Sequence, residues 1–286
     1  MHVTETLFRY HGADGTPLAG FVWRGDTEPR ALLQLAHGAG EHSGRYRERL
    51  APLTEAGFLI YAADHRGHGL TSGMSHFGDF GPGGAEACVS DMAELAKLAK
   101  AENPGLPLTL MGHSMGAMFA QAFLPEHHGL IDALILSGTS GPGPRREGTA
   151  NSAFPNPRTD YDWLSRDETE VDKYIADPLS GISFTPTSQA SFRTVAAKAM
   201  GTPDLSGIKP ALPVYVFVGD EDPINNRLAA VTPLIDTYRA AGMDVTFKVY
   251  PGGRHEMLNE TNRDEVVADL LRWLEGKAAR ASVSLT

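Results

Sequence analysis

The stretch "LPLTLMGHSMGAMFAQAF" at residues 106–123 changes character at its middle. Its first half is apolar and suits a strand, whereas its second half has the small and apolar residues of a buried helix. The halves meet at Gly-His-Ser-Met-Gly, residues 112–116. A strand that runs into a helix through Gly-x-Ser-x-Gly holds its serine on a strained corner above the edge of a sheet. The stretch therefore predicts that Ser114 is presented as a nucleophile.

Strands and helices are predicted to alternate along most of the chain. Two β-rich runs at 4–10 and 18–24 flank a turn-rich connection and predict an antiparallel hairpin. Six short apolar runs follow, beginning near residues 31, 57, 107, 130, 212 and 244, and such runs are typical of buried parallel strands. Helices are predicted between them at about 45–56, 84–102, 115–127, 227–241 and 262–279. This order predicts a doubly wound α/β fold with a mostly parallel sheet and helices on both faces.

Residues 139–205 interrupt this alternation. The segment opens with a run rich in proline and glycine and continues into short, partly helical pieces without a core strand. An insertion of this length is usually functional. We therefore expect a core made of residues 1–138 and 206–286, with residues 139–205 as a cap over the mouth of the sheet.

The composition excludes several classes of protein. A formal net charge of −10 without a basic stripe argues against a nucleic-acid partner. The single cysteine, Cys88, excludes an internal disulfide and fits a reducing compartment. No segment approaches the length needed to cross a bilayer, and the first residues lack a secretory pattern. We expect a cytoplasmic protein without stable membrane insertion, as a monomer or a homodimer.

A serine hydroxyl needs a base that takes its proton and an acid that orients the base. In a fold of this type, the chain order is serine, then acid, then histidine. The loop after the strand at 212–219 carries Asp220 and Asp222, and the loop after the next strand carries His255. We predict Asp222 as the acid, with Asp220 as the alternative, and His255 as the base.

The reaction also needs donors for the negative charge that develops on the substrate oxygen. The loop "HGAGEHSGRY" at 37–46 consists of small residues after an early strand, so its backbone N–H groups can point into the site. We predict that the backbone N–H groups of Ala39 and Met115 form this oxyanion hole. His65 and His68 lack the accompanying ligands of a metal site, and the predicted chemistry needs neither a metal nor a cofactor.

Taken together, these motifs resemble the α/β-hydrolases, and within them the monoacylglycerol lipase and lysophospholipase-like serine hydrolases. The resemblance is carried by "HGAGEHSGRY" at 37–46, "DHRGHGLTSG" at 64–73, "GHSMGA" at 112–117, "GDEDPI" at 219–224 and "PGGRHEMLNE" at 251–260. It implies an α/β-hydrolase fold with an inserted cap, the triad and oxyanion hole named above, and no cofactor.

The resemblance further suggests that Glu41 and Arg45 border the alcohol side of the substrate. The alternative for this pair is a salt bridge that braces the oxyanion loop. Neither role follows from the local sequence alone.

The activity implied by the resemblance is hydrolysis of carboxylic esters through an acyl-serine intermediate, with a small-molecule or monoacylglycerol-like ester as substrate. The cap is acidic, which opposes adsorption to anionic lipid surfaces and favours dispersed esters. Two alternatives remain open. One is an amide or peptide hydrolase of the aminopeptidase kind, in which the acidic cap holds the amino terminus of the substrate. The other is a non-catalytic receptor that binds a small molecule in the same pocket.

Overall fold

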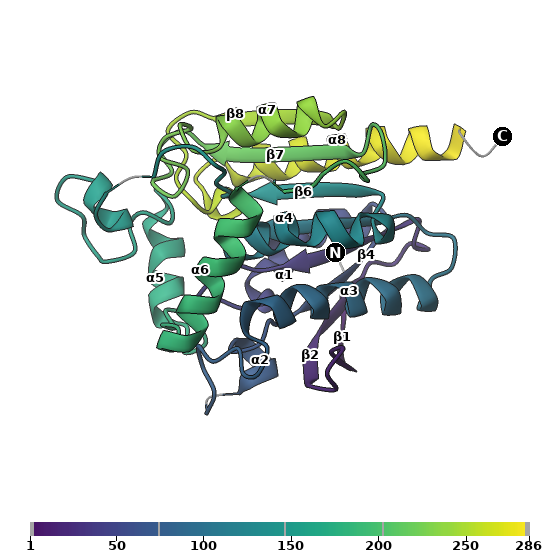
Figure 1. Ribbon diagram of the computed structural model, residues 1–286, viewed down its shortest axis with the longest axis horizontal. Coiled ribbons are helices and arrows are strands. Elements are labelled where there is room, and N and C mark those ends of the chain that lie inside the picture. Colours follow the sequence, from purple (N-terminus) through teal and green to yellow (C-terminus); the bar gives the residue numbers. More distant parts are fainter. Residues whose placement is uncertain (1–2, 74, 146, 202, 284–286) are drawn as a thin grey trace.

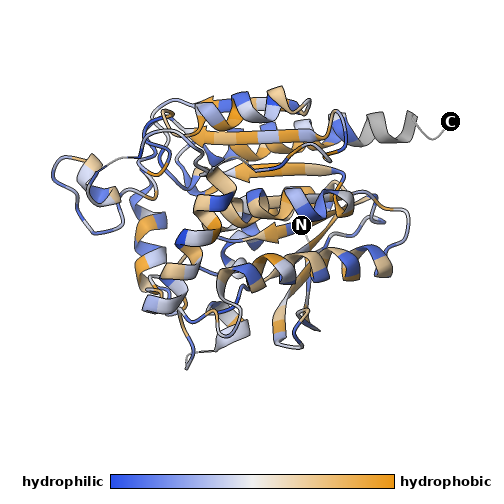
Figure 2. Cartoon of the chain, in the orientation of Figure 1, coloured by the Kyte–Doolittle hydropathy of each residue, from blue (hydrophilic) through white to orange (hydrophobic). Residues whose placement is uncertain are grey.

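The computed structural model describes residues 3–73, 75–145, 147–201 and 203–283. Its centre is one eight-stranded sheet in the order β1-β2-β4-β3-β5-β6-β7-β8, with helices on both faces (Figure 1). The predicted α/β fold with a mostly parallel sheet is confirmed. Figure 2 shows that the strands are mainly hydrophobic, as expected for a sheet that is covered on both sides.

All eight predicted strands are present. They are β1 (Thr4–His11), β2 (Pro17–Arg24), β3 (Ala31–Ala36), β4 (Phe58–Ala63), β5 (Leu108–His113), β6 (Ala133–Ser137), β7 (Pro213–Gly219) and β8 (Asp244–Tyr250). β1 and β2 form the predicted antiparallel hairpin, β2 is antiparallel to β4, and the remaining pairs are parallel. Because β3, β5, β6, β7 and β8 run in parallel, the loops after them meet at one edge of the sheet.

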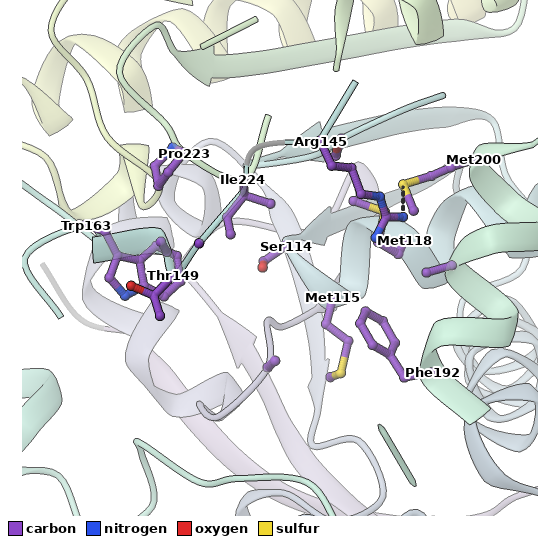
Figure 3. Close-up of a pocket in the computed structure, with 15 residues that line it drawn as sticks. Ser114, Met115, Met118, Arg145, Thr149, Trp163, Phe192, Met200, Pro223 and Ile224 are labelled. Atoms are coloured by element: carbon purple, nitrogen blue, oxygen red, sulfur yellow. Dashed lines mark hydrogen bonds between the residues drawn. The ribbon is translucent and has the colours of Figure 1, made fainter. Parts of the chain in front are cut away.

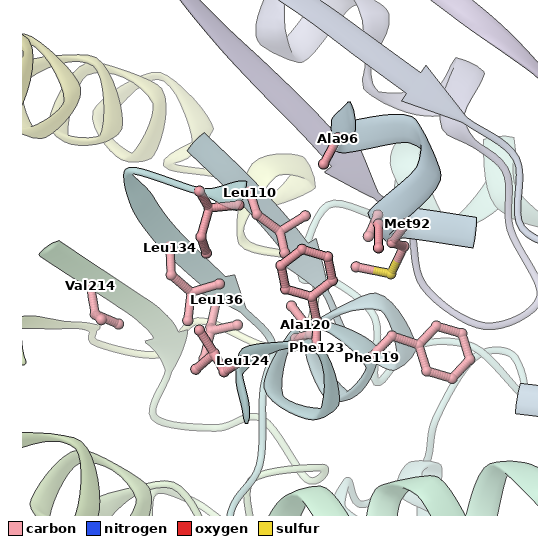
Figure 4. Close-up of a cluster of buried hydrophobic side chains, with 14 of the residues drawn as sticks. Met92, Ala96, Leu110, Phe119, Ala120, Phe123, Leu124, Leu134, Leu136 and Val214 are labelled. Atoms are coloured by element: carbon pink, nitrogen blue, oxygen red, sulfur yellow. The ribbon is translucent and has the colours of Figure 1, made fainter. Parts of the chain in front are cut away.

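The helices cover the two faces unequally. They are α1 (Arg47–Glu55), α2 (Gly69–Ser72), α3 (Gly84–Glu102), α4 (Met115–His127), α5 (Glu168–Ala176), α6 (Pro186–Met200), α7 (Thr232–Ala240) and α8 (Arg263–Val283). α1 and α8 pack on one face, and α3, α4 and α7 pack on the other. Figure 4 shows the hydrophobic core on the second of these faces, where side chains of α3 and α4 meet those of β5 and β6.

The start of α7 is the helix boundary that differs most from the prediction. α7 was expected from residue 227 but begins at Thr232. Asn226, Arg227 and Leu228 have positive φ angles of 51°, 51° and 75°, which a right-handed helix cannot contain. The short helix α2 and the 3-10 turn Ser43–Tyr46 were not predicted.

Residues 139–205 contribute α5 and α6 but no strand among the described residues. α6 packs on α3 and α4, and the ring of Phe192 lies 5.9 Å from that of Phe119. α5 and the segment after it lie on the loop that follows β3, where the Tyr174 hydroxyl and the Gly181 N–H both donate to Gly40 O, at 2.9 and 2.8 Å. This placement supports the proposal that residues 139–205 act as a cap.

No helix in the described part of the chain combines the length and the apolar character that crossing a bilayer requires.

Candidate active site

Ser114 lies on the turn between β5 and α4, with φ 52° and ψ −115°. This positive φ is unusual for a residue other than glycine and marks a strained corner. The corner is tight on both sides: a Cβ on Gly112 would lie 2.5 Å from Gly116 O, and one on Gly116 would lie 2.1 Å from Ala36 O. The backbone of Ser114 is anchored to the neighbouring strand, since its N–H donates to Ser137 O at 2.9 Å.

The loops after β7 and β8 bring Asp222 and His255 together. Asp222 Oδ2 lies 3.0 Å from His255 Nδ1, and its Oδ1 accepts the N–H of Ile224 at 2.8 Å. The alternative acid, Asp220, accepts the N–H of Gly252 at 2.6 Å and so braces the β8 loop instead. The geometry therefore supports Asp222 as the partner of His255.

His255 is held in a form that can accept a proton. Burial lowers the pKa of its imidazole, but the charge of Asp222 and the hydrogen bond to it outweigh burial, so the net pKa is raised. Because Nδ1 donates to Asp222, Nε2 is the acceptor nitrogen. His255 Nε2 is buried and has no hydrogen-bond partner in the described residues, Ser114 included. In the absence of substrate, such catalytic hydrogen bonds are often long and tighten only in the complex.

Two rings flank His255. The ring centres of His113 and Trp163 each lie 4.9 Å from that of His255. The backbone N–H of His255 also donates to Trp163 O at 3.4 Å. Burial, followed by the charge of His255, lowers the pKa of His113 to about 4, so His113 is a neutral packing residue. Trp163 belongs to residues 139–205, and sequence reasoning did not connect it with the base because the contact depends on how that segment folds back.

The predicted oxyanion donors lie beside the nucleophile. Ala39 and Met115 line the same cavity as Ser114. Met115 is the first residue of α4, where an N–H has no acceptor within the helix. In the described residues, no protein acceptor takes the N–H of Ala39 or of Met115. Both donors are thus available to an oxygen of a substrate, and the positive end of the α4 dipole adds to their effect.

Glu41 and Arg45 form a buried brace. The Glu41 carboxylate accepts the Gly38 N–H and the Tyr46 hydroxyl, both at 2.6 Å, and pairs with Arg45. Burial would raise the pKa of Glu41, but the charge of Arg45 overcomes it, and the net pKa falls to about 2. Arg45 also makes two bonds of 2.8 Å to the carboxylate of Glu256, the residue after His255. The geometry favours the bracing alternative over contact with the substrate alcohol.

The histidines that could suggest a metal have structural tasks. His68 Nε2 accepts the N–H of Gly40 at 3.2 Å, and His37 Nε2 accepts the N–H of His65 at 3.0 Å. Burial lowers the pKa of all three rings, that of His68 to about 3. The neutral rings of His37 and His68 therefore hold the oxyanion loop against the loop after β4. The His65 ring, which bonds to the His37 ring only through its backbone N–H, packs 5.3 Å from the ring of Phe119.

A cavity of about 360 Å³ opens beside Ser114 (Figure 3). Its apolar walls come from the core and from residues 139–205, and they include Met115, Met118, Trp163, Phe192, Met200 and Ile224. Polar groups are few: Ser140, Arg145 and Thr149 line it together with Ser114. No Asp or Glu of the described residues lines it. Predominantly apolar walls with a few polar groups are typical of small-molecule sites.

The family model for serine aminopeptidases of family S33 matches residues 27–262. The chain belongs to this family. A monoacylglycerol lipase of Mycolicibacterium smegmatis is 33% identical over 283 residues, which cover 95% of this chain and 97% of that protein. The human monoglyceride lipase is 30% identical over 293 residues, which cover 95% of this chain and 91% of that protein. The protein is an α/β-hydrolase of the monoacylglycerol lipase type.

Solved structures agree with this assignment of the α/β-hydrolase. A thermostable carboxyl esterase from Bacillus coagulans, in complex with glycerol, superposes with a TM-score of 0.88 and 29% identity over 97% of this chain and 99% of that chain. A soluble variant of the Saccharomyces cerevisiae monoglyceride lipase gives a TM-score of 0.78 at 21% identity, over 96% of this chain and 95% of that chain. The second similarity concerns the fold alone.

Proposed function

We propose that this α/β-hydrolase is a carboxylic ester hydrolase that acts through an acyl-serine intermediate. One observation carries the proposal: His255 is oriented by Asp222, has an unpartnered Nε2, and packs 4.9 Å from the ring of Trp163, which lines the same apolar cavity as Ser114. The relatives with lipase and esterase names support an ester as the substrate. Substrates of the monoacylglycerol class fit this proposal.

Each step of the proposed reaction has a group to perform it. His255 Nε2 takes the proton of the Ser114 hydroxyl while Oγ bonds to the ester carbonyl carbon. The carbonyl oxygen becomes negative and accepts bonds from the N–H groups of Ala39 and Met115. The intermediate then collapses, and the alcohol leaves with the proton from His255. Water repeats the sequence on the acyl-enzyme and releases the carboxylic acid.

The apolar walls of the cavity favour esters with a hydrocarbon chain. Each methylene transferred from water into such walls contributes about 0.8 kcal/mol. Met118, Phe192 and Met200 offer these walls on one side of Ser114 (Figure 3). We expect medium-chain esters to be hydrolysed more efficiently than acetates.

The structure argues against an aminopeptidase activity. That alternative requires a carboxylate in the cap to hold the amino terminus of the substrate, but three acids of the cap have partners elsewhere. Asp177 lies 2.8 Å from His42, Glu170 lies 2.7 Å from Arg49, and Asp167 binds Arg263 at 2.6 Å. None of these carboxylates lines the cavity. Among the described residues that line the cavity, an incoming ammonium group would find no carboxylate.

A receptor without catalytic activity would have no use for the strained serine. A backbone in this region costs on the order of 1–3 kcal/mol. Strain of this kind is retained where it serves a site, and here it aims a hydroxyl at the cavity.

A labelling experiment tests the proposal. The native protein should react with a fluorophosphonate probe and release p-nitrophenol from p-nitrophenyl esters, and both signals should vanish in Ser114→Ala. Turnover of aminoacyl anilides measured beside the esters tests the amide alternative. An unlabelled native protein would support the receptor, and faster anilide cleavage would support the amidase.

We also propose that the enzyme works in the cytoplasm. Cys88, the single cysteine, is fully buried on α3. Burial, the largest cause, and the charge of Asp91 raise the pKa of its thiol, which keeps the thiol protonated. Such a residue fits a reducing compartment.

A further inference from the structure

Arg145 is the one charged side chain among the described residues that line the cavity. It lies on the loop after β6, near Met118 and Met200 (Figure 3). Its Nη2 is 3.6 Å from the sulfur of Met200, which is a weak acceptor. Among the described residues this sulfur is the one hydrogen-bond partner of Arg145, and no carboxylate pairs with the side chain, although the chain carries an excess of acidic groups.

The other arginines near the site are committed to partners. Arg45 binds Glu41 and Glu256, and Arg166 binds Glu260. Arg254 donates to backbone carbonyls and lies over the ring of Phe154. Arg145 therefore differs from these side chains: it is exposed to solvent, lines the cavity, and has only the weak Met200 sulfur as a partner among the described residues.

A second donor lies on the same segment. Ser140 is buried and lines the cavity. Its carbonyl accepts from Gln121 at 2.9 Å and holds the backbone in place. In the described residues, the hydrogen bonds of Ser140 are made by its carbonyl and none by its hydroxyl. The Ser140 hydroxyl and the Arg145 guanidinium thus line the same cavity, and an anion bound there could accept from both.

We infer that Arg145, assisted by Ser140, forms a subsite for an oxyanion of the substrate, so that the enzyme prefers esters bearing a carboxylate or phosphate. This inference rests on the proposed ester hydrolysis in the same cavity. The guanidinium presents a planar fork of N–H donors that matches both carboxylate and phosphate. The apolar walls take the hydrocarbon part of the same molecule.

The subsite could bind an anionic group on either part of the ester. The anion can belong to the acyl group, as in a dicarboxylic monoester, or to the alcohol, as in an acylated glycerol phosphate. In either case, the charge is a few bonds from the ester carbonyl at Ser114. Matched substrate pairs distinguish the two placements.

The kinetic test compares charged and neutral esters of equal length. For the acyl side, p-nitrophenyl hemiglutarate is compared with p-nitrophenyl pentanoate. For the alcohol side, butyrylglycerol phosphate is compared with monobutyrin. We expect Arg145→Gln to lower the charged-to-neutral ratio of kcat/KM about three- to tenfold in one pair, from the upper values of exposed ion pairs up to just below those of hydrogen bonds to charged groups. Arg145→Lys should retain part of the preference.

A control separates this effect from the loss of any positive charge. Arg193→Gln removes an exposed arginine of α6 that does not line the cavity and forms no ion pair with a described residue. It should leave both ratios unchanged. An Arg145→Gln variant with unchanged ratios in both pairs, or an equal loss in Arg193→Gln, would overturn the subsite while ester hydrolysis stands.

A binding measurement makes the test independent of catalysis. Trp163 lines the cavity, so its fluorescence should report titration with hexyl phosphate or with 1-hexanol. Arg145→Gln should weaken hexyl phosphate about three- to tenfold and leave 1-hexanol unchanged. Equal affinities of the native protein and the variant for hexyl phosphate would overturn the inference, even if the protein hydrolysed no ester.

Discussion

Replacing Asp222 by asparagine keeps the shape of the side chain but removes its charge and one acceptor. In the native structure, one carboxylate oxygen takes the N–H of His255 Nδ1 and the other takes the N–H of Ile224. An amide has one oxygen and one NH2 group, so it can satisfy only one of these donors. If the oxygen faces Ile224, the NH2 faces Nδ1, and the imidazole must carry its proton on Nε2. The base is then blocked.

The size of the effect follows from this exchange. Loss of the orienting acid in a serine triad lowers kcat by about 10⁴, and here we expect a loss of about 10³ to 10⁴. By the rate relation, this is about 4 to 5.5 kcal/mol of activation free energy. Stability should fall less, by about 1–3 kcal/mol for one buried donor left without a partner. Initial rates on p-nitrophenyl butyrate and urea unfolding measure the two quantities.

Asp220→Asn is the matched control. Asp220 accepts a single backbone N–H, from Gly252, and the amide oxygen of asparagine can keep that bond. We expect its kcat to stay within a few-fold of native. A variant Asp222→Asn that keeps more than a tenth of native kcat, or a larger loss in Asp220→Asn, would refute the assignment of the acid.

Three further predictions concern pH, the serine turn and the brace. Since the charge of Asp222 overcomes burial and raises the pKa of His255, and since the base must be unprotonated, kcat/KM should fall with decreasing pH through a value above the ordinary 6.5. A pH profile whose acid limb lies well below that value would contradict this. Gly116→Ala should abolish labelling by fluorophosphonate and lower the Tm, because its Cβ would lie 2.1 Å from Ala36 O. In the control Gly129→Ala, the added Cβ meets nothing within 4 Å, so its Tm should equal that of the native protein. Equal Tm values for the two variants would count against the tight corner. Arg45→Ala should cost about 3–5 kcal/mol in urea unfolding, because it leaves the carboxylates of Glu41 and Glu256 buried without their partner, whereas Arg272→Ala at an exposed pair should cost under about 1 kcal/mol. Similar losses in these two variants would show that the brace is no stronger than a surface pair.

The strands and most helices could be predicted because their signal is local. Apolar runs and 3.6-residue spacing report burial directly, and α3 and α4 have the predicted bounds. The start of α7 could not be read in this way. Asn225 Oδ1 accepts the N–H of Leu228 at 2.8 Å, and this local contact accompanies the positive φ angles before the helix. Helix propensity does not encode a side chain that bonds its own loop.

The site residues that could be predicted from the sequence are those whose positions follow from the order of the strands. Ser114, Asp222 and His255 each follow a strand of the sheet, so topology alone predicts that they meet. The choice between Asp220 and Asp222 needed the geometry, since both follow β7. Under the amidase alternative, the acids of the cap would face a substrate, but their partners, such as His42 and Arg263, lie far away in the sequence. Tertiary pairing of this kind leaves no local pattern.

The neutral histidines around the site have a consequence for how the enzyme responds to acid. Burial keeps the pKa of His68 at about 3, and burial together with the charge of His255 keeps that of His113 at about 4. His37 and His65 are likewise shifted downward in pKa by burial. As a solution is made mildly acidic, these imidazoles keep their protonation state while His255 gains a proton. Protonation of His255 Nε2 should therefore abolish activity reversibly. The surrounding histidines keep their protonation state, so activity should return on neutralisation.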